Sequence, residues 1–342
     1  MDKQRLISVA RSLVAPAKGI LAADESTGTI KRRFDSIGVE CTEDNRRDYR
    51  ELLFRTQEVG SYISGVILFD ETIRQAAADG TPLVSILSDQ GIIPGIKVDT
   101  GAKPLAGAPG ETVTEGLDGL RERLKEYEAI GAGFTKWRAV INIGPDIPST
   151  YSIETNAHAL ARFAALSQES GLVPIVEPEV LMDGDHDIQR CEEVTEATLK
   201  EVFAQLRRQK VELEGMLLKP NMVLSGINAV GRAEAEEVAE RTISCFKRTI
   251  PEGVPGIVFL SGGQSDEEAT INLDAINRRG YLVGVPWELS FSYGRGLQAA
   301  PLKSWGGKKD NITNAQVALR HRSVVTSAAR QGIYIKEMED QQ

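Results

Sequence analysis

Histidine and cysteine are both scarce in this chain, which contains three of each among its 342 residues. The cysteines are far apart in the sequence, so they offer neither a CxxC metal motif nor a disulfide framework: Cys41, Cys191 and Cys245. The histidines match no zinc-binding spacing and no calcium-binding loop: His158, His186 and His321. We therefore expect a cytoplasmic protein, in a reducing compartment, that uses no metal and no cofactor.

Positive charge is not in excess either. The 40 Lys and Arg residues face 49 Asp and Glu residues, which gives a net charge of −9. A protein that binds nucleic acid carries a basic footprint, so we expect no nucleic-acid partner, whereas a phosphorylated small molecule needs only a local basic pocket. No apolar stretch is long enough to span a bilayer, and residues 1–14 lack the apolar core of a secretory signal. We expect no membrane partner.

What the chain does have is a regular alternation of apolar runs with amphipathic stretches. The runs are rich in Ile, Val and Leu, as strands buried on both faces require. They cover residues 19–23, 65–69, 92–98, 134–143, 172–180, 215–218, 256–260 and 281–291. Eight such runs alternating with helices predict an α/β fold, a closed TIM (β/α)8 barrel. An open doubly wound sheet is the alternative, but its G-x-G-x-x-G fingerprint is missing after the first run.

The stretches between the runs predict the helices. Their apolar residues recur at helical spacing over residues 46–59, 117–130, 155–170, 194–210, 233–249 and 267–278. Residues 99–119 and 304–309 are rich in glycine and are expected to be surface loops. Because no linker divides the chain, we predict one barrel domain over residues 1–342. Its C-terminal tail from about residue 333 is expected to be short and flexible, with the polar residues 336–342 frayed.

Charged residues stand at the ends of five of the apolar runs: Asp24, Lys97 and Asp99, Lys136 and Arg138, Glu177 and Glu179, and Lys219. The members of each pair are two residues apart, so they point to the same side of a strand. A charge in an apolar strand is costly unless it is paired or solvated. In a barrel the carboxyl ends of the strands form one face, where active sites lie. We predict that these charges converge there, although any single pair could be a purely structural ion pair.

A site rich in lysine and poor in histidine favours a lysine nucleophile. Free lysine has a pKa of about 10.4 and is protonated at neutral pH, and burial together with a neighbouring cation frees the amine. Lys219 follows an apolar run and precedes Pro220, and Lys136 on another run can supply the neighbouring cation. Glu177 can shuttle protons while an imine forms. The residues therefore predict Schiff-base chemistry at Lys219.

Two groups of residues near the strand ends are suited to binding phosphate. Loops after strands seven and eight of barrels commonly bind phosphate, and here they contain a Ser-Gly-Gly turn and an arginine: Ser261, Gly262, Gly263 and Arg295. A lysine and two hydroxyl groups can form a second anion site across the barrel mouth: Lys97, Ser26 and Thr29. Two anion sites that flank a lysine predict a bisphosphate substrate.

These same residues resemble the class I fructose-bisphosphate aldolase family. The matching segments are GILAADESTGTI (19–30), GIKVD (95–99), TKWR (135–138), PIVEPEVLMDGDHD (174–187), LLKPNM (217–222), FLSGGQS (259–265) and FSYGRGLQA (291–299). Together they are far more specific than any one motif alone. The resemblance implies reversible cleavage of fructose 1,6-bisphosphate to dihydroxyacetone phosphate and glyceraldehyde 3-phosphate, without a metal, in a homotetramer.

The resemblance also implies a role for each site residue. Lys219 corresponds to the lysine that forms the imine, and Glu177, with Glu179 beside it, to the proton shuttle. Asp24 is placed to take the C4 hydroxyl proton as the C3–C4 bond breaks. Lys136 and Arg138 correspond to residues that hold the charge of the site and contact the substrate, and Arg32 and Arg33 to the family's basic pair. The resemblance implies that the C1 phosphate binds Ser261, Gly262, Gly263 and Arg295. It implies that the C6 phosphate binds near Lys97, Ser26 and Thr29.

One departure and two rival hypotheses remain. Animal members of the family end in a tyrosine that assists protonation of the enamine, whereas the last tyrosine here is Tyr334, so the proton donor is left open. Another Schiff-base barrel, such as a transaldolase or a deoxyribose-phosphate aldolase, would leave one of the two anion sites idle. A scaffold protein that has lost catalysis would have no use for the full set of charged residues.

Overall fold

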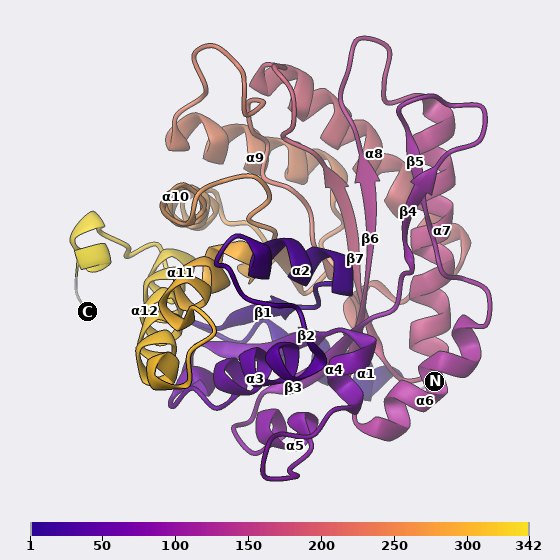
Figure 1. Ribbon diagram of the computed structural model, residues 1–342. Coiled ribbons are helices and arrows are strands. Elements are labelled where there is room, and N and C mark those ends of the chain that lie inside the picture. The colour runs from indigo at the N-terminus through magenta and orange to yellow at the C-terminus, as the bar shows by residue number, and fades with distance from the viewer. Residues whose placement is uncertain (1, 341–342) are drawn as a thin grey trace.

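The computed structural model describes residues 2–340, and it contains a closed barrel of parallel strands surrounded by helices (Figure 1). Around the barrel the strands follow the order β1-β10-β9-β8-β7-β6-β3-β2, and every neighbouring pair is parallel. This confirms the predicted TIM barrel. The strands are β1 (Gly19–Ala23), β2 (Ile63–Leu68), β3 (Ile93–Lys97), β6 (Phe134–Ile141), β7 (Val173–Val180), β8 (Leu217–Leu218), β9 (Gly256–Phe259) and β10 (Glu288–Tyr293).

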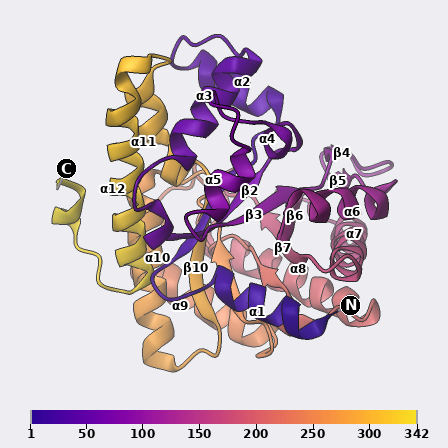
Figure 2. The same cartoon turned by 90° about the horizontal axis from the view of Figure 1, so that it is seen from below.

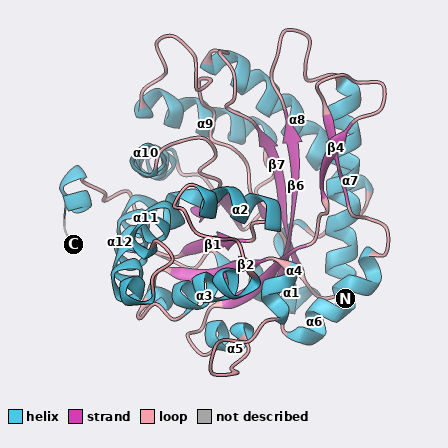
Figure 3. Ribbon diagram, in the orientation of Figure 1, coloured by secondary structure: helices cyan, strands magenta, loops and turns pink. Residues whose placement is uncertain are grey.

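Helices enclose the strands, as the cyan ribbons around the magenta arrows show (Figure 3). Several helices begin after an N-cap residue whose side chain accepts the free backbone N–H three residues further on. These N-cap residues are Asp2 for α1, Thr42 for α3, Ser149 for α7, Asp187 for α8 and Ser265 for α10. The helices are α1 (Lys3–Leu13), α2 (Thr27–Asp35), α3 (Glu43–Phe54), α4 (Asp70–Arg74), α5 (Leu83–Ser88), α6 (Leu120–Ile130), α7 (Thr150–Glu169), α8 (Ile188–Arg208), α9 (Ala235–Thr249), α10 (Asp266–Val283), α11 (Arg295–Trp305) and α12 (Ile312–Arg330), with short 3-10 helices at Val59–Ser61, Leu213–Gly215, Lys309–Asn311 and Lys336–Asp340. In residues 2–340 no helix is long and apolar enough to cross a bilayer.

Two of the predicted elements were wrong. The eighth apolar run was expected to be a strand from residue 281, but Tyr281–Val283 is the last turn of α10, and β10 begins only at Glu288. The segment 99–119 was expected to be a loop, yet it contains an antiparallel hairpin of β4 (Gly101–Pro104) and β5 (Thr112–Glu115). The other predicted loop, 304–309, begins in the end of α11 and reaches the first residue of a 3-10 helix.

The amino end of the barrel is closed by an apolar cluster. Leu6, Ala10 and Leu13 of α1 pack against inward-pointing strand residues such as Phe134 and Leu217. The view from below shows α1, in indigo, in the foreground (Figure 2). Gly95 leaves room for the ring of Phe134, because a Cβ there would lie 2.3 Å from it. The charged side chains of the barrel cavity lie at the opposite, carboxyl end.

The C-terminal segment lies on the opposite side of the molecule from the N-terminus (Figures 1 and 2). Residues Lys336–Asp340 form a 3-10 helix, and Glu339 pairs with the buried Arg322 of α12 at 2.5 Å. The Tyr334 backbone N–H donates to Asp274 of α10. The predicted single domain and flexible tail stay predictions, and Gln341 and Gln342 lie outside the described residues.

Candidate active site

A cavity of about 690 Å³ opens at the carboxyl ends of the barrel strands. It brings together side chains from strand ends that are far apart in the sequence, as predicted for a barrel. All but one of the predicted site residues line it: Asp24, Ser26, Thr29, Lys97, Lys136, Arg138, Glu177, Glu179, Lys219, Ser261, Gly262 and Arg295. The exception is Gly263, whose backbone instead lies close to Met182, with room for no Cβ between them.

Four charged side chains form the centre of the cavity. Lys219 Nζ lies 3.3 Å from Glu177 Oε1, and Lys136 Nζ lies 3.4 Å from Glu177 Oε2 and 2.5 Å from Asp24 Oδ2. Two lysines and two carboxylates thus alternate in one chain. Among the described residues, Glu177 Oε2 has no hydrogen-bond partner besides this long ion pair. That oxygen is free to accept a proton or to bind a hydroxyl group.

The strands place these charges by simple alternation. Lys136 on β6 and Glu177 on β7 each follow an inward-pointing apolar residue two positions earlier, Phe134 and Ile175. The sixth barrel strand, β8, is only two residues long, but the Lys219 N–H donates to Val176 O at 2.8 Å and continues the ladder. Lys219 is therefore fixed by backbone pairing although it stands just outside the strand.

Opposite charges hold three of the four groups ionised. Burial alone would raise the pKa of the Asp24 carboxyl, but Lys136 and Lys219 outweigh it and hold that pKa well below its usual range. Burial would also raise the pKa of Glu177, and Lys219 and Lys136 again lower it. For Lys136 burial would lower the pKa, yet Asp24 and Glu177 raise it above the ordinary lysine value. At neutral pH, Lys136 is thus an ammonium between two carboxylates.

One side of the cavity mouth carries a set of anion-binding groups on β3, β6 and α2. Lys97 pairs with Asp99 at 2.8 Å, and the Arg138 guanidinium pairs with Glu179. Helix α2 begins nearby, after Ser26, whose side chain accepts none of its N–H groups. The Thr29 N–H donates to Ser26 O at 2.8 Å, so the N–H groups that precede it remain available to an anion. The Thr29 hydroxyl accepts a hydrogen bond from the Ser26 hydroxyl at 3.3 Å and another from the Arg32 guanidinium at 3.2 Å.

The other side carries the predicted Ser-Gly-Gly turn. Gly262 has φ of +57°, a left-handed conformation that suits glycine and lets the turn expose its backbone. The guanidinium of Arg295, at the start of α11, donates to Gly262 O across the loops after β9 and β10. Both sets of anion-binding groups line the cavity that contains Lys219, and their binding of two phosphates stays a prediction.

The role of Glu25 was missed. Its side chain is buried beside Asp24 and accepts from Arg33, eight residues further on, and from two more distant residues, Arg50 at 2.8 Å and Gln298 at 2.8 Å. The sequence showed only an acidic neighbour of Asp24, and no local pattern indicates partners this distant. These bonds tie the end of β1 to α2, α3 and α11.

A family model for class I fructose-bisphosphate aldolases, described as glycolytic, matches residues 5–342 of this chain, which is nearly its whole length. The chain belongs to the class I fructose-bisphosphate aldolases. It is therefore a carbon–carbon lyase of glycolysis that acts on fructose 1,6-bisphosphate, as expected from the motifs.

Individual relatives agree with this assignment. A probable fructose-bisphosphate aldolase class 1 of Xanthomonas campestris is 58% identical over 97% of this chain and 99% of its own. Fructose-bisphosphate aldolase 4, cytosolic, of Arabidopsis thaliana is 53% identical over 96% of this chain and 83% of its own. A solved aldolase of Plasmodium falciparum, in complex with TRAP and an inhibitor, is 48% identical, with a TM-score of 0.95 over 97% of this chain and 95% of that one.

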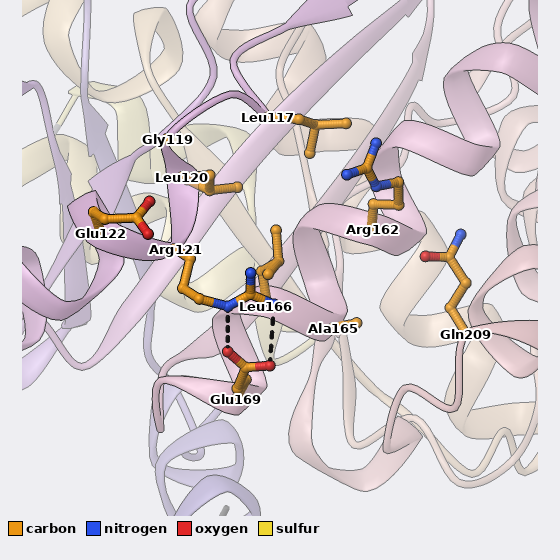
Figure 4. Close-up of a pocket in the computed structure, with 10 residues that line it drawn as sticks. All are labelled: Leu117, Gly119, Leu120, Arg121, Glu122, Arg162, Ala165, Leu166, Glu169 and Gln209. Carbon is orange, nitrogen blue, oxygen red and sulfur yellow. Dashed lines mark hydrogen bonds and ion pairs between the residues drawn. The ribbon is translucent and has the colours of Figure 1, made fainter.

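A second hollow lies outside the barrel of this aldolase, between α6 and α7 (Figure 4). Its volume is about 310 Å³, and its one ion pair among the residues drawn joins Arg121 to Glu169. Both side chains are about half exposed. It offers none of the buried, alternating charges that distinguish the barrel cavity.

Proposed function

We propose that this aldolase cleaves fructose 1,6-bisphosphate through a Schiff base on Lys219. The observation that carries the proposal is the 3.3 Å approach of Lys219 Nζ to the Glu177 carboxylate in a buried site. Glu177 first takes a proton from the Lys219 nitrogen, and the free amine then attacks the C2 carbonyl. A second nitrogen proton moves to the new alkoxide, and Glu177 returns its proton to the resulting hydroxyl, which leaves as water. The product is a protonated imine, which draws electrons from C3.

Asp24 is proposed to be the base for bond cleavage. Its low pKa keeps it ionised, so it accepts the C4 hydroxyl proton as the C3–C4 bond breaks and the bonding electrons move into the imine. Glyceraldehyde 3-phosphate leaves, and an enamine remains on Lys219. Lys136, held as an ammonium by Asp24 and Glu177, stabilises the negative charge that develops on oxygen.

The enamine must then be protonated at C3 before water releases dihydroxyacetone phosphate. Tyr334 is bonded to Asp274 and Glu339 and does not line the cavity. We assign this transfer to Glu177, which lies beside Lys219. The proton it donates is the one that Asp24 took from the C4 hydroxyl, passed on through Lys136, whose Nζ contacts both carboxylates.

The two phosphates are proposed to bind on opposite sides of Lys219. The C1 phosphate lies on the turn of Ser261 and Gly262 with Arg295, and the C6 phosphate lies near Lys97 and the start of α2. Gly263 completes the proposed C1 phosphate site. Ser26, Thr29 and Arg138 complete the proposed C6 phosphate site, and Glu179 is the ion-pair partner of Arg138.

The test compares wild type with Lys219→Met for cleavage of fructose 1,6-bisphosphate in the presence of a chelator. Wild type should remain active, and Lys219→Met should be folded by circular dichroism but slower by about six orders of magnitude, the loss typical of removing a nucleophile. Activity retained by Lys219→Met, or lost in wild type on chelation, would refute the proposal.

We also propose a homotetramer of single-domain subunits located in the cytosol. The family resemblance supports the tetramer, and two relatives from Arabidopsis thaliana that are more than 50% identical carry the word cytosolic in their names. Light scattering coupled to gel filtration should give four times the 37.2 kDa chain mass. A monomer at micromolar concentration would contradict the assembly and leave the chemistry untouched.

A further inference from the structure

Strand β6 extends beyond its neighbour β3. The two strands pair only as far as Lys97 and Lys136, whereas on its other side β6 stays paired with β7 up to Ile141. From Arg138 onward, one edge of β6 thus faces no barrel strand. Backbone N–H and C=O groups on such an edge need other partners, and Arg138 is one of the residues assigned above to the substrate.

The β4–β5 hairpin supplies those partners. It lies beside β6 at the edge that β3 leaves open (Figures 1 and 3). The hydroxyl of Thr114 on β5 donates to Arg138 O at 2.7 Å. Just before the hairpin, Asp99 Oδ2 accepts from the Arg138 N–H at 3.3 Å. The peptide groups of Arg138 are therefore held on this edge by side chains of one segment.

The same carboxylate also holds the lysine of this anion site. Asp99 is buried, and its Oδ1 lies 2.8 Å from Lys97 Nζ and accepts from the Gly101 N–H at 3.2 Å. The first strand of the hairpin thus begins at Gly101, whose N–H is bonded to the carboxylate that orients Lys97. The position of the hairpin is in this way coupled to the two cations, Lys97 and Arg138, on this side of the cavity.

The hairpin is itself anchored to a helix. Asn156 of α7 is 2% exposed, donates to Thr112 O at 2.8 Å and accepts from the Thr114 N–H at 3.4 Å. Gly116, with φ of +126°, brings the chain back so closely that a Cβ would lie 2.9 Å from Thr100 N. Thr114 is therefore held rigidly between α7 and Arg138.

We propose that Thr114 is a positioning residue that sets the geometry of Arg138 for the second phosphate, and so the preference for a bisphosphate over a monophosphate. The inference rests on the proposed function, which places the C6 phosphate on this side of the cavity. The hydrogen bonds of Thr114 reach Asn156 and Arg138 rather than Lys219 or Glu177, so it acts through the backbone of Arg138. The loss of its hydroxyl should therefore weaken binding of the C6 phosphate without slowing imine chemistry.

The experiment measures kcat and KM of Thr114→Val and Thr114→Ser with fructose 1,6-bisphosphate and with fructose 1-phosphate. Valine keeps the shape but removes the donor, so KM for the bisphosphate should rise about three- to tenfold, the effect of one hydrogen bond, with kcat nearly unchanged. KM for fructose 1-phosphate, which has no C6 phosphate, should change by less than about twofold. Serine restores the donor and should restore KM.

Thr198→Val is the matched control, because the Thr198 hydroxyl is equally buried on α8 but has no hydrogen-bond partner among residues 2–340. It should leave both substrates unaffected. An equal loss with both substrates, or no change in Thr114→Val, would overturn the proposal. Should Thr114→Val not fold, Thr114→Ala gives the same comparison.

A separate readout distinguishes failure of this inference from failure of the proposed function. Borohydride reduction of wild type with dihydroxyacetone phosphate should label Lys219, and Thr114→Val should be labelled to the same extent. An unlabelled wild type would refute the Schiff base itself. A labelled wild type with no substrate-dependent effect of Thr114→Val would refute the positioning role alone.

Discussion

The two ends of the barrel interior differ completely in chemistry although the same strands supply both. On β6 and β8, Phe134 and Leu217 point into the apolar floor, and two residues later Lys136 and Lys219 point into the charged cavity. The change takes only one step of the side-chain alternation. The floor excludes water from below, so each charge above it depends on its partners rather than on solvent.

Substitutions at the two ends of the barrel interior should therefore have different effects. At the floor a substitution changes volume and therefore stability, because packed interiors tolerate neither voids nor overpacking. At the cavity a substitution that keeps the shape but removes a charge leaves a buried partner uncompensated. Changes at the cavity should therefore affect catalysis and the pH dependence of stability, whereas changes at the floor should affect stability alone.

The largest effect is expected from Glu177→Gln at the charged end. Glutamine keeps the shape but cannot take the proton from Lys219, which lies 3.3 Å away in the wild type. We expect kcat to fall by about 10²- to 10⁴-fold, with a smaller change in KM. Steady-state cleavage of fructose 1,6-bisphosphate measures this directly, and a variant that keeps more than half of kcat would exclude Glu177 as the proton shuttle.

The next effect is a loss of stability in Asp24→Asn, which leaves the buried Lys136 without the carboxylate 2.5 Å away. Urea unfolding at pH 7 should show a loss of about 3 kcal/mol, as for other broken buried pairs. Because the folded-state pKa of Asp24 is lowered, its contribution is present above the unfolded pKa of about 3.9 and is lost as the pH falls below it.

The pH dependence provides the check on this explanation. The stability difference between wild type and Asp24→Asn should stay constant from about pH 7 to pH 5 and narrow below about pH 4. A difference that instead grew on acidification would mean that the ionised carboxylate of Asp24 does not stabilise the fold.

A moderate effect is expected at the floor from Gly95→Ala, whose Cβ would lie 2.3 Å from the Phe134 ring. Overpacking of this kind costs about 1–3 kcal/mol, and adding Phe134→Leu should recover part of the loss by making room. Thermal unfolding of both single variants and the double variant tests this coupling. If Gly95→Ala lowered kcat per folded molecule tenfold, the separation between floor and cavity would not hold.

The smallest effect is expected outside the barrel, from Glu169→Gln in the hollow of Figure 4. Its partner Arg121 is 2.7 Å away, but both side chains are about half exposed, so solvent screens the pair and it contributes little to stability. Urea unfolding and cleavage should both match wild type. This variant is also the matched control for Glu177→Gln, since it removes the same charge from a solvated pair.

The sequence was sufficient for the barrel and for most of the cavity because both follow from local patterns. Runs of buried residues predicted the strands, and charges two residues apart predicted the side chains that meet at one face. Lys219 was found although β8 has only two residues, because the apolar run before it marks the strand position.

The sequence-based predictions failed where a local pattern was ambiguous or where the contacts that decide the structure join segments far apart in the sequence. The apolar Tyr281 and Leu282 were read as the start of a strand, yet they are 89% and 76% exposed at the end of α10, and a short apolar run cannot distinguish the two. The β4–β5 hairpin lacks an apolar alternation because side-chain bonds from Asn156 and Thr114 hold it instead. The Glu25 bonds likewise join segments that no local pattern connects.

The central claim, an imine on Lys219, is tested most directly by borohydride trapping. The protein is incubated with dihydroxyacetone phosphate and a chelator, reduced, digested and examined by mass spectrometry. We predict a reduced adduct on the peptide that contains Lys219 and none on the peptide that contains Lys136, which its two carboxylates hold as an ammonium. An adduct on Lys136, or no adduct together with activity that the chelator abolishes, would contradict it.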